Sequence, residues 1–160
     1  MTSGQRLRQL ANVLNASTPM GLLLAVCARA GIRRGPRGLI LATGYRWRLP
    51  WAAAFTVGNV VLFRAGPAEA LGNPVLLGHE ERHSTQYAWC LGVPFLPLYV
   101  LAAGWSQWRT GNPGSANPFE RHAGLQAGGY PPARAKTVTR PLPGNSPSKT
   151  AGTAPNRNEA

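Results

Sequence analysis

The most informative part of the chain is residues 73–92, which read NPVLLGHEERHSTQYAWCLG. Its initial Asn-Pro pair has the residue types preferred at a helix N-cap and at the first helical position. The glycine at its end is a typical helix stop. The segment is therefore predicted to be a helix. On that helix His79 and His83 are four residues apart, so both imidazoles project from one face.

The two histidines belong to an HExxH motif that also contains Glu80. Two imidazoles one turn apart can bind one Zn²⁺ at about 2.0–2.1 Å each. Glu80 lies about 100° around the helix from His79, where it can reach a water on the metal and take its proton. Glu81 and Arg82 are predicted to face solvent. The alternative is a surface helix that carries two incidental histidines.

A catalytic zinc needs a third protein ligand. In the extended form of the motif a glycine and a histidine follow, but those positions hold Gln86 and Trp89. Glu120 is the leading candidate, since it is the one carboxylate between the motif and the C-terminal tail. Its alternative role is a capping box with Asn117, three residues earlier. His122 is the competing ligand, and it could instead be a transition-state donor or a surface histidine.

Further side chains lie near the motif by helical spacing. Gln86 and Tyr87 share the face of the two histidines and are expected to line the site or to hydrogen-bond to it. Cys90 lies about 10 Å along the helix from His83, too far to share its metal, and is expected to be a small core residue. Tyr99 and Tyr130 are candidate oxyanion donors, for which simple packing is the alternative.

Outside the motif the apolar spacing and the Pro and Gly positions predict the remaining elements. Leucines at spacings of three and four indicate an amphipathic first helix. The β-branched and aromatic residues of FTVGNVVLF indicate a strand. The predicted helices are 5–15, 18–30, 94–110 and 117–123, the predicted strands are 39–48 and 54–64, and the predicted connectors are 33–38 and 66–73.

These elements predict an α+β fold, with a short antiparallel sheet packed on the HExxH helix and on the helix that follows it. A chain of 160 residues has room for one domain and a tail. We expect an Arg-rich helical segment over residues 1–34, a metal-binding domain over 35–130, and a disordered basic tail over 131–160 that is rich in Pro, Ser and Thr.

Composition excludes several classes of protein. Two cysteines cannot make a disulfide framework. The chain has no uninterrupted run of 18 apolar residues, so a membrane-spanning helix is not predicted. The net charge of +12 lies at the ends: residues 1–48 hold eight arginines and no acid, whereas residues 49–130 are balanced. Such ends favour weak contact with an anionic membrane surface. Nucleic-acid binding is disfavoured, because aromatic residues are not interleaved with the bases of the tail.

The runs GHEERHSTQYAWCLG, FLPLYVLAAG and NPFERHAG together resemble small bacterial zincin-like proteins of the gluzincin type. The shared pattern is HExxHxxQ, an apolar helix and a later NPFExxA, and the resemblance covers residues 39–130. It implies a minimal zincin-like core. It also implies that His79, His83 and Glu120 are metal ligands and that Glu80 is the general base.

Together these features predict a metallopeptidase that holds one Zn²⁺ per chain and acts on a peptide or protein substrate. The strand over residues 54–64 is a candidate to pair with an extended substrate, and the alternative is a plain core strand. The alternative is a non-catalytic zinc-binding protein with a structural or interaction role. The expected location is the cytoplasm, with peripheral membrane contact, and the sequence indicates no obligate oligomer.

Overall fold

The computed structural model describes residues 1–48, 50 and 52–132, and it has the predicted α+β fold. Its four-stranded sheet has the order β1-β2-β4-β3. The sheet is mixed where an antiparallel one was predicted, because β2 and β4 run parallel while the two outer pairs are antiparallel. The strands are β1 (Gly31–Arg34), β2 (Ile40–Thr43), β3 (Ala54–Val57) and β4 (Val60–Phe63).

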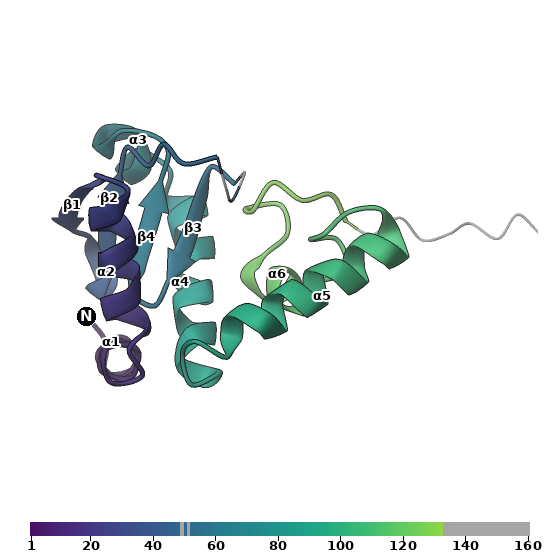
Figure 1. Cartoon of the computed structure of the whole chain (residues 1–160), viewed down its shortest axis with the longest axis horizontal. Helices are drawn as coiled ribbons and strands as arrows, with labels where there is room; N and C mark the ends of the chain where they lie inside the picture. Colours follow the sequence, from purple (N-terminus) through teal and green to yellow (C-terminus); the bar gives the residue numbers. More distant parts are fainter. Residues whose placement is uncertain (49, 51, 133–160) are drawn as a thin grey trace, which may run out of the picture.

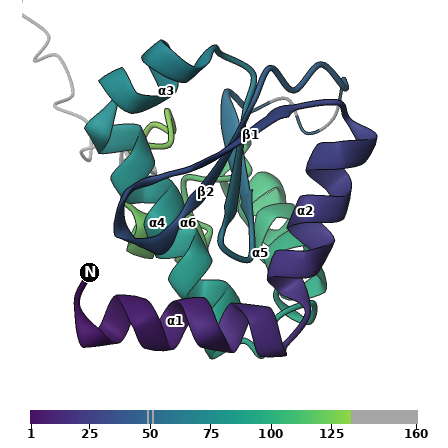
Figure 2. The same cartoon turned by 90° about the vertical axis from the view of Figure 1, so that its left-hand side faces the viewer.

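Helices cover both faces of this sheet. Figure 1 shows α2 on one side of the strands and α4 on the other, with α5 and α6 extending beyond β3. Figure 2 shows α1 running along the base of the molecule. The helices are α1 (Ser3–Leu14), α2 (Ser17–Cys27), α3 (Pro67–Gly72), α4 (Pro74–Trp89), α5 (Phe95–Thr110) and α6 (Pro118–Ala123), and a short 3₁₀ turn, η1, spans Pro36–Gly38.

The core lies on the two faces of the central strand β4, whose four residues are all buried. Side chains alternate between the faces of a strand. Val60 and Leu62 accordingly pack in one cluster with Ala25 of α2. Val61 and Phe63 pack in a second cluster that includes Leu77 of α4. This second cluster fixes α4, and with it the HExxH motif, against the sheet.

The predicted strand over residues 54–64 is in fact a hairpin of β3 and β4. Its turn contains Gly58, which has a φ of +63°. A Cβ at this glycine would lie 2.5 Å from the backbone of Ser17, so the turn needs glycine for both its conformation and its packing. The pair Gly58-Asn59 interrupts the run, and such a pair between two strand-like segments is typical of a hairpin turn, which the prediction of one strand overlooked. The predicted strand over 39–48 likewise ends early, at Thr43.

Both predicted connectors contain regular structure. Residues 33–38 hold the end of β1 and the turn η1, and residues 66–73 hold α3. All four residues of β1 are exposed, so the strand forms by backbone pairing with β2 and leaves no apolar pattern in the sequence. In α3 the Gly66-Pro67 pair begins a helix. Apart from residues 131 and 132, the predicted tail lies outside the described residues.

No single helix of the described chain combines the length and the apolar character needed to cross a membrane, although α1 and α2, bent by 72° at their junction, meet that test as a pair.

Candidate metal centre

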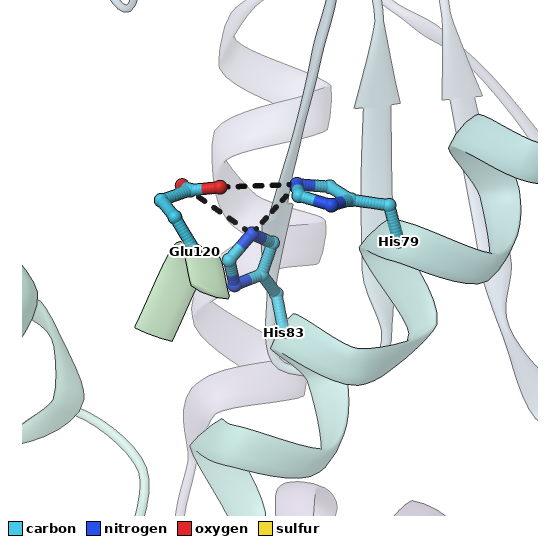
Figure 3. Close-up of side chains that lie close together, drawn as sticks. All are labelled: His79, His83 and Glu120. Carbon is cyan, nitrogen blue, oxygen red and sulfur yellow. Dashed lines mark hydrogen bonds and ion pairs between the residues drawn. The ribbon is translucent and has the colours of Figure 1, made fainter. Parts of the chain in front are cut away.

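Two helices bring the predicted ligands together (Figure 3). The Nε2 atoms of His79 and His83, both on α4, are 3.0 Å apart. Glu120 on α6 places its Oε2 3.3 Å from His79 Nε2 and its Oε1 3.5 Å from His83 Nε2. All three residues are buried, with exposed fractions of 3%, 7% and 2%.

The orientation of Glu120 follows from how α6 begins. Asn117 is the N-cap, and its side chain accepts a hydrogen bond from Phe119 N at 3.0 Å. Its backbone N–H, which a capping box would direct at Glu120, donates instead to the carbonyl of Gly114 at 3.0 Å. The capping box is therefore not formed, and the Glu120 carboxylate faces the two histidines.

The outer nitrogen of each imidazole is held by an acceptor. His79 Nδ1 lies 3.1 Å from the carbonyls of both Ala123 and Gly124. His83 Nδ1 lies 2.8 Å from Gln86 Oε1. The amide of Gln86 is oriented by its other end, which donates to Phe119 O at 2.9 Å. Acceptors at both Nδ1 atoms place the ring protons there, which leaves a lone pair on each Nε2.

The inner atoms of the cluster therefore all carry lone pairs. Two Nε2 atoms and a carboxylate converge, and Glu120 Oε2 is buried without a hydrogen-bond donor. Such an arrangement is repulsive unless a cation lies among the atoms. Ligands about 2.0–2.1 Å from one tetrahedral centre lie about 3.4 Å apart, close to the three separations seen here. The buried triad could hold a metal ion.

Glu120 and His83 shift each other's pKa. Burial raises the pKa of Glu120, but its close contacts with His79 and His83, the charge of His83 and the hydrogen bond from Tyr99 outweigh burial and lower that pKa to about 2. Burial lowers the pKa of His83, but its contacts with Glu120 and the charge of Glu80 outweigh it, so this pKa is raised. The acid of the triad is thus kept ionised, as a metal ligand must be.

Glu80 lies beside the triad and outside it. It is 3% exposed, and its Oε2 accepts a hydrogen bond from the Thr56 hydroxyl of β3 at 2.8 Å. Burial raises the pKa of Glu80, and the charge of His83 and the Thr56 hydrogen bond oppose that rise. The carboxylate is therefore oriented and poorly hydrated, which makes it a stronger base than an exposed glutamate.

A tyrosine of α5 completes the contacts of the third ligand. The hydroxyl of Tyr99 donates a short hydrogen bond to Glu120 Oε1. Burial, followed by the charge of Glu120, raises the pKa of Tyr99, so it remains a donor. Burial and the charge of Glu120 also raise the pKa of Tyr130, which hydrogen-bonds with Tyr99. Of the two candidate oxyanion donors, Tyr99 thus contacts the Glu120 carboxylate, and Tyr130 contacts Tyr99.

A turn-rich covering segment, residues 124–130, lies over the triad after α6. A Cβ on Gly128 would lie 2.6 Å from His79 Cε1 and 2.8 Å from its Nε2. A Cβ on Gly114 would likewise lie 2.3 Å from the ring of Tyr130. Glycine at 128 lets the backbone approach the His79 ring, so the covering segment shields this side of the triad.

The other side chains singled out in the sequence lie apart from the triad. His122 is exposed, accepts from Gln86 Nε2 at 3.2 Å and packs against Trp89. Tyr87 is a core residue whose ring centroid is 4.5 Å from that of Phe95. Cys90 packs at the edge of the same cluster. Sequence reasoning missed Thr56 and Gly128, because neither is tied to the motif by spacing or residue pattern.

Comparison of the chain with models of known protein families, with curated proteins and with solved structures finds no match.

Proposed function

We propose that the protein is a zinc-dependent hydrolase of peptide bonds, built on a minimal core of the gluzincin type. The observation that carries the proposal is the convergence of four lone-pair atoms, from His79, His83 and Glu120, in one buried space. Two imidazoles and one carboxylate are the donor set of many catalytic zinc sites, and they leave a coordination position open.

A zinc ion held there supplies Lewis-acid chemistry and makes water nucleophilic near neutral pH. Glu80 is the general base: its carboxylate takes the proton of the attacking water and passes it to the leaving amine. Thr56 positions that carboxylate through its hydrogen bond to Oε2. Gln86 and the carbonyls of Ala123 and Gly124 hold the two imidazoles in the tautomer that ligates a metal.

The position of β3 at the edge of the sheet favours a peptide as the substrate. β3 is an edge strand, paired with β4 on one side. Its Thr56 contacts Glu80, so an extended chain added to this edge would lie near the general base. Because the triad is buried, the covering segment must move before such a chain can reach it.

The test compares metal content with hydrolysis. Wild-type protein purified without chelator should contain about one zinc per chain, and His83→Ala and Glu120→Ala should each lose it. Glu80→Gln should keep the zinc and lose cleavage of an unstructured protein substrate. Thr56→Val should keep the zinc and move the acid limb of the pH–rate profile to higher pH, because the hydrogen bond that lowers the pKa of Glu80 is gone.

Absence of stoichiometric metal after supply of zinc would overturn the proposal. A second candidate, a non-catalytic zinc-binding protein, is favoured by one observation, the close cover of His79 by Gly128. It predicts bound zinc in the wild type with no hydrolysis at any pH, and no effect of Glu80→Gln beyond a change in stability.

A further inference from the structure

The first helix has its polar face turned inward. Arg8 and Asn12 are 6% and 0% exposed. Leu7, Leu10 and Leu14, spaced by three and four residues along the opposite face, are 69%, 56% and 76% exposed. An amphipathic helix on a globular protein normally buries its apolar face. Here three leucines form a stripe, which we call the leucine stripe, with no partner among the described residues.

The inward contacts fix this orientation. Arg8 pairs with Glu81 of α4 at 2.8 Å and donates to Arg37 O at 2.5 Å. Asn12 Nδ2 donates to Ser84 O at 2.8 Å and to Asn59 Oδ1 at 3.1 Å. Rotating α1 to bury its leucines would break all four contacts and leave buried polar groups unpaired. The exposed leucines are therefore a consequence of the fold, and fraying of the helix does not explain them.

The corner between α4 and α5 extends the apolar surface. Leu91 at this corner is 77% exposed and has a φ of +57°, a conformation that a leucine rarely adopts. The next residue, Gly92, packs on Asn15 just after the end of α1. Figures 1 and 2 show α1 along the base of the molecule, at the end opposite α3. Leu91 therefore adds a fourth exposed leucine beside the C-terminal end of the stripe.

The positive charge near the leucine stripe favours an anionic partner. Residues 1–48 carry eight arginines and no acid, and within the described part of the chain Glu81 pairs with Arg8 and Arg37. Arg6 is exposed and precedes Leu10 by one helical turn, which lets its stem lie along the stripe with its charge at the edge. Leucines flanked by positive charge are typical of helices that lie in the surface of an anionic bilayer.

We propose that α1 docks on anionic lipid, with the leucine stripe in the acyl boundary and Arg6 among the headgroups. The helix would then lie flat on the membrane. The metal triad lies across α4 from α1: on that helix His79 and His83 project from the face opposite Glu81 and Ser84. The surface is independent of the proposed hydrolysis, so either proposal can fail without the other.

The experiment is co-sedimentation of the full chain with phosphatidylcholine vesicles, with and without phosphatidylglycerol. Wild type should bind the anionic vesicles, and added salt should weaken binding. Leu7→Gln, Leu10→Gln and Leu14→Gln combined should reduce binding about tenfold or more. This variant keeps the net charge, and its zinc content and thermal unfolding should be close to those of wild type, because the three side chains are exposed.

The matched control combines Leu71→Gln and Val75→Gln, two exposed apolar residues at the α3 end of the molecule. This variant should bind vesicles as wild type does. The proposal is overturned if wild type does not bind anionic vesicles, or if the leucine variant binds as well as wild type. It is also overturned if wild type forms a dimer without lipid that the leucine variant abolishes, because the stripe would then bind a second copy of the chain.

Discussion

Gln86 should control how tightly the metal binds without ligating it. Its Oε1 holds His83 Nδ1 at 2.8 Å, and its Nε2 holds Phe119 O at 2.9 Å, so one side chain orients a ligand and ties α4 to α6. Gln86→Leu keeps the approximate volume and removes both bonds. Gln86→Glu keeps the acceptor for the imidazole and loses the donor to Phe119. The two variants therefore separate orientation of the ligand from attachment of the helix.

The magnitudes follow from these contacts. Loss of a partner that orients a metal-bound histidine typically weakens metal affinity 10- to 100-fold, which corresponds to about 1.4–2.7 kcal/mol. Gln86→Leu should weaken zinc binding by that amount, whereas Gln86→Glu should bind zinc at least as tightly as wild type. Each buried group left unpaired costs about 1–3 kcal/mol, so both variants should unfold at lower urea concentration in the metal-free state.

The assay is competition for zinc against a chromophoric chelator, with urea unfolding of the metal-free proteins measured alongside. His122→Ala is the control, because His122 is exposed and only accepts from the same amide; its zinc affinity should change less than about threefold. Equal zinc affinity in wild type and Gln86→Leu would contradict this prediction, since His83 would then be oriented by something other than Gln86.

Three further predictions test the acid–base state of the site, its cover and the packing of α1. Zinc binds the neutral imidazole, and contacts with Glu120 hold the pKa of His83 above its usual value. Apparent zinc affinity should therefore fall as the pH is lowered through that raised pKa, and calorimetry in two buffers should show proton release on binding. Gly128→Ala places a Cβ 2.6 Å from His79 Cε1, so a chelator should strip zinc from it faster than from wild type. Asn12→Ala removes buried hydrogen bonds to Ser84 and Asn59 and should lower the free energy of unfolding by about 2–4 kcal/mol, with zinc affinity unchanged.

The sequence predicts the elements that carry the triad because their signals are local. Asn73 and Asn117 are N-caps whose side chains bond within three residues, and a proline follows each. The four-residue spacing of His79 and His83 fixes their common face. What the sequence leaves open is whether Glu120 caps its own helix or faces the histidines. That choice depends on the carbonyl of Gly114, which occupies the N–H of the cap.

The elements that sequence reasoning missed are held by contacts that leave little local pattern. β1 is exposed at all four residues and exists because its backbone pairs with β2. The parallel pairing of β2 with β4, which makes the sheet mixed, joins strands separated by β3 in the chain. Thr56 contacts Glu80 only because the hairpin places β3 beside α4. Each of these depends on tertiary arrangement, which hydrophobic periodicity does not encode.

The side chains of α4 determine which face of α1 is turned inward. Burying Leu7 and Leu10 against α4 would contribute about 3–6 kcal/mol from apolar area. The face that α4 offers carries Glu81 and Ser84, and apolar side chains would leave both desolvated without partners, which costs more for a charge than for a neutral group.

That face of α4 is available to α1 because the opposite face, with His79, His83 and Gln86, is directed at α6. The polar groups of α1 therefore face inward to pair with Glu81 and Ser84, and the leucines face outward. The exposed leucine stripe follows from the side of α4 on which the triad of His79, His83 and Glu120 lies.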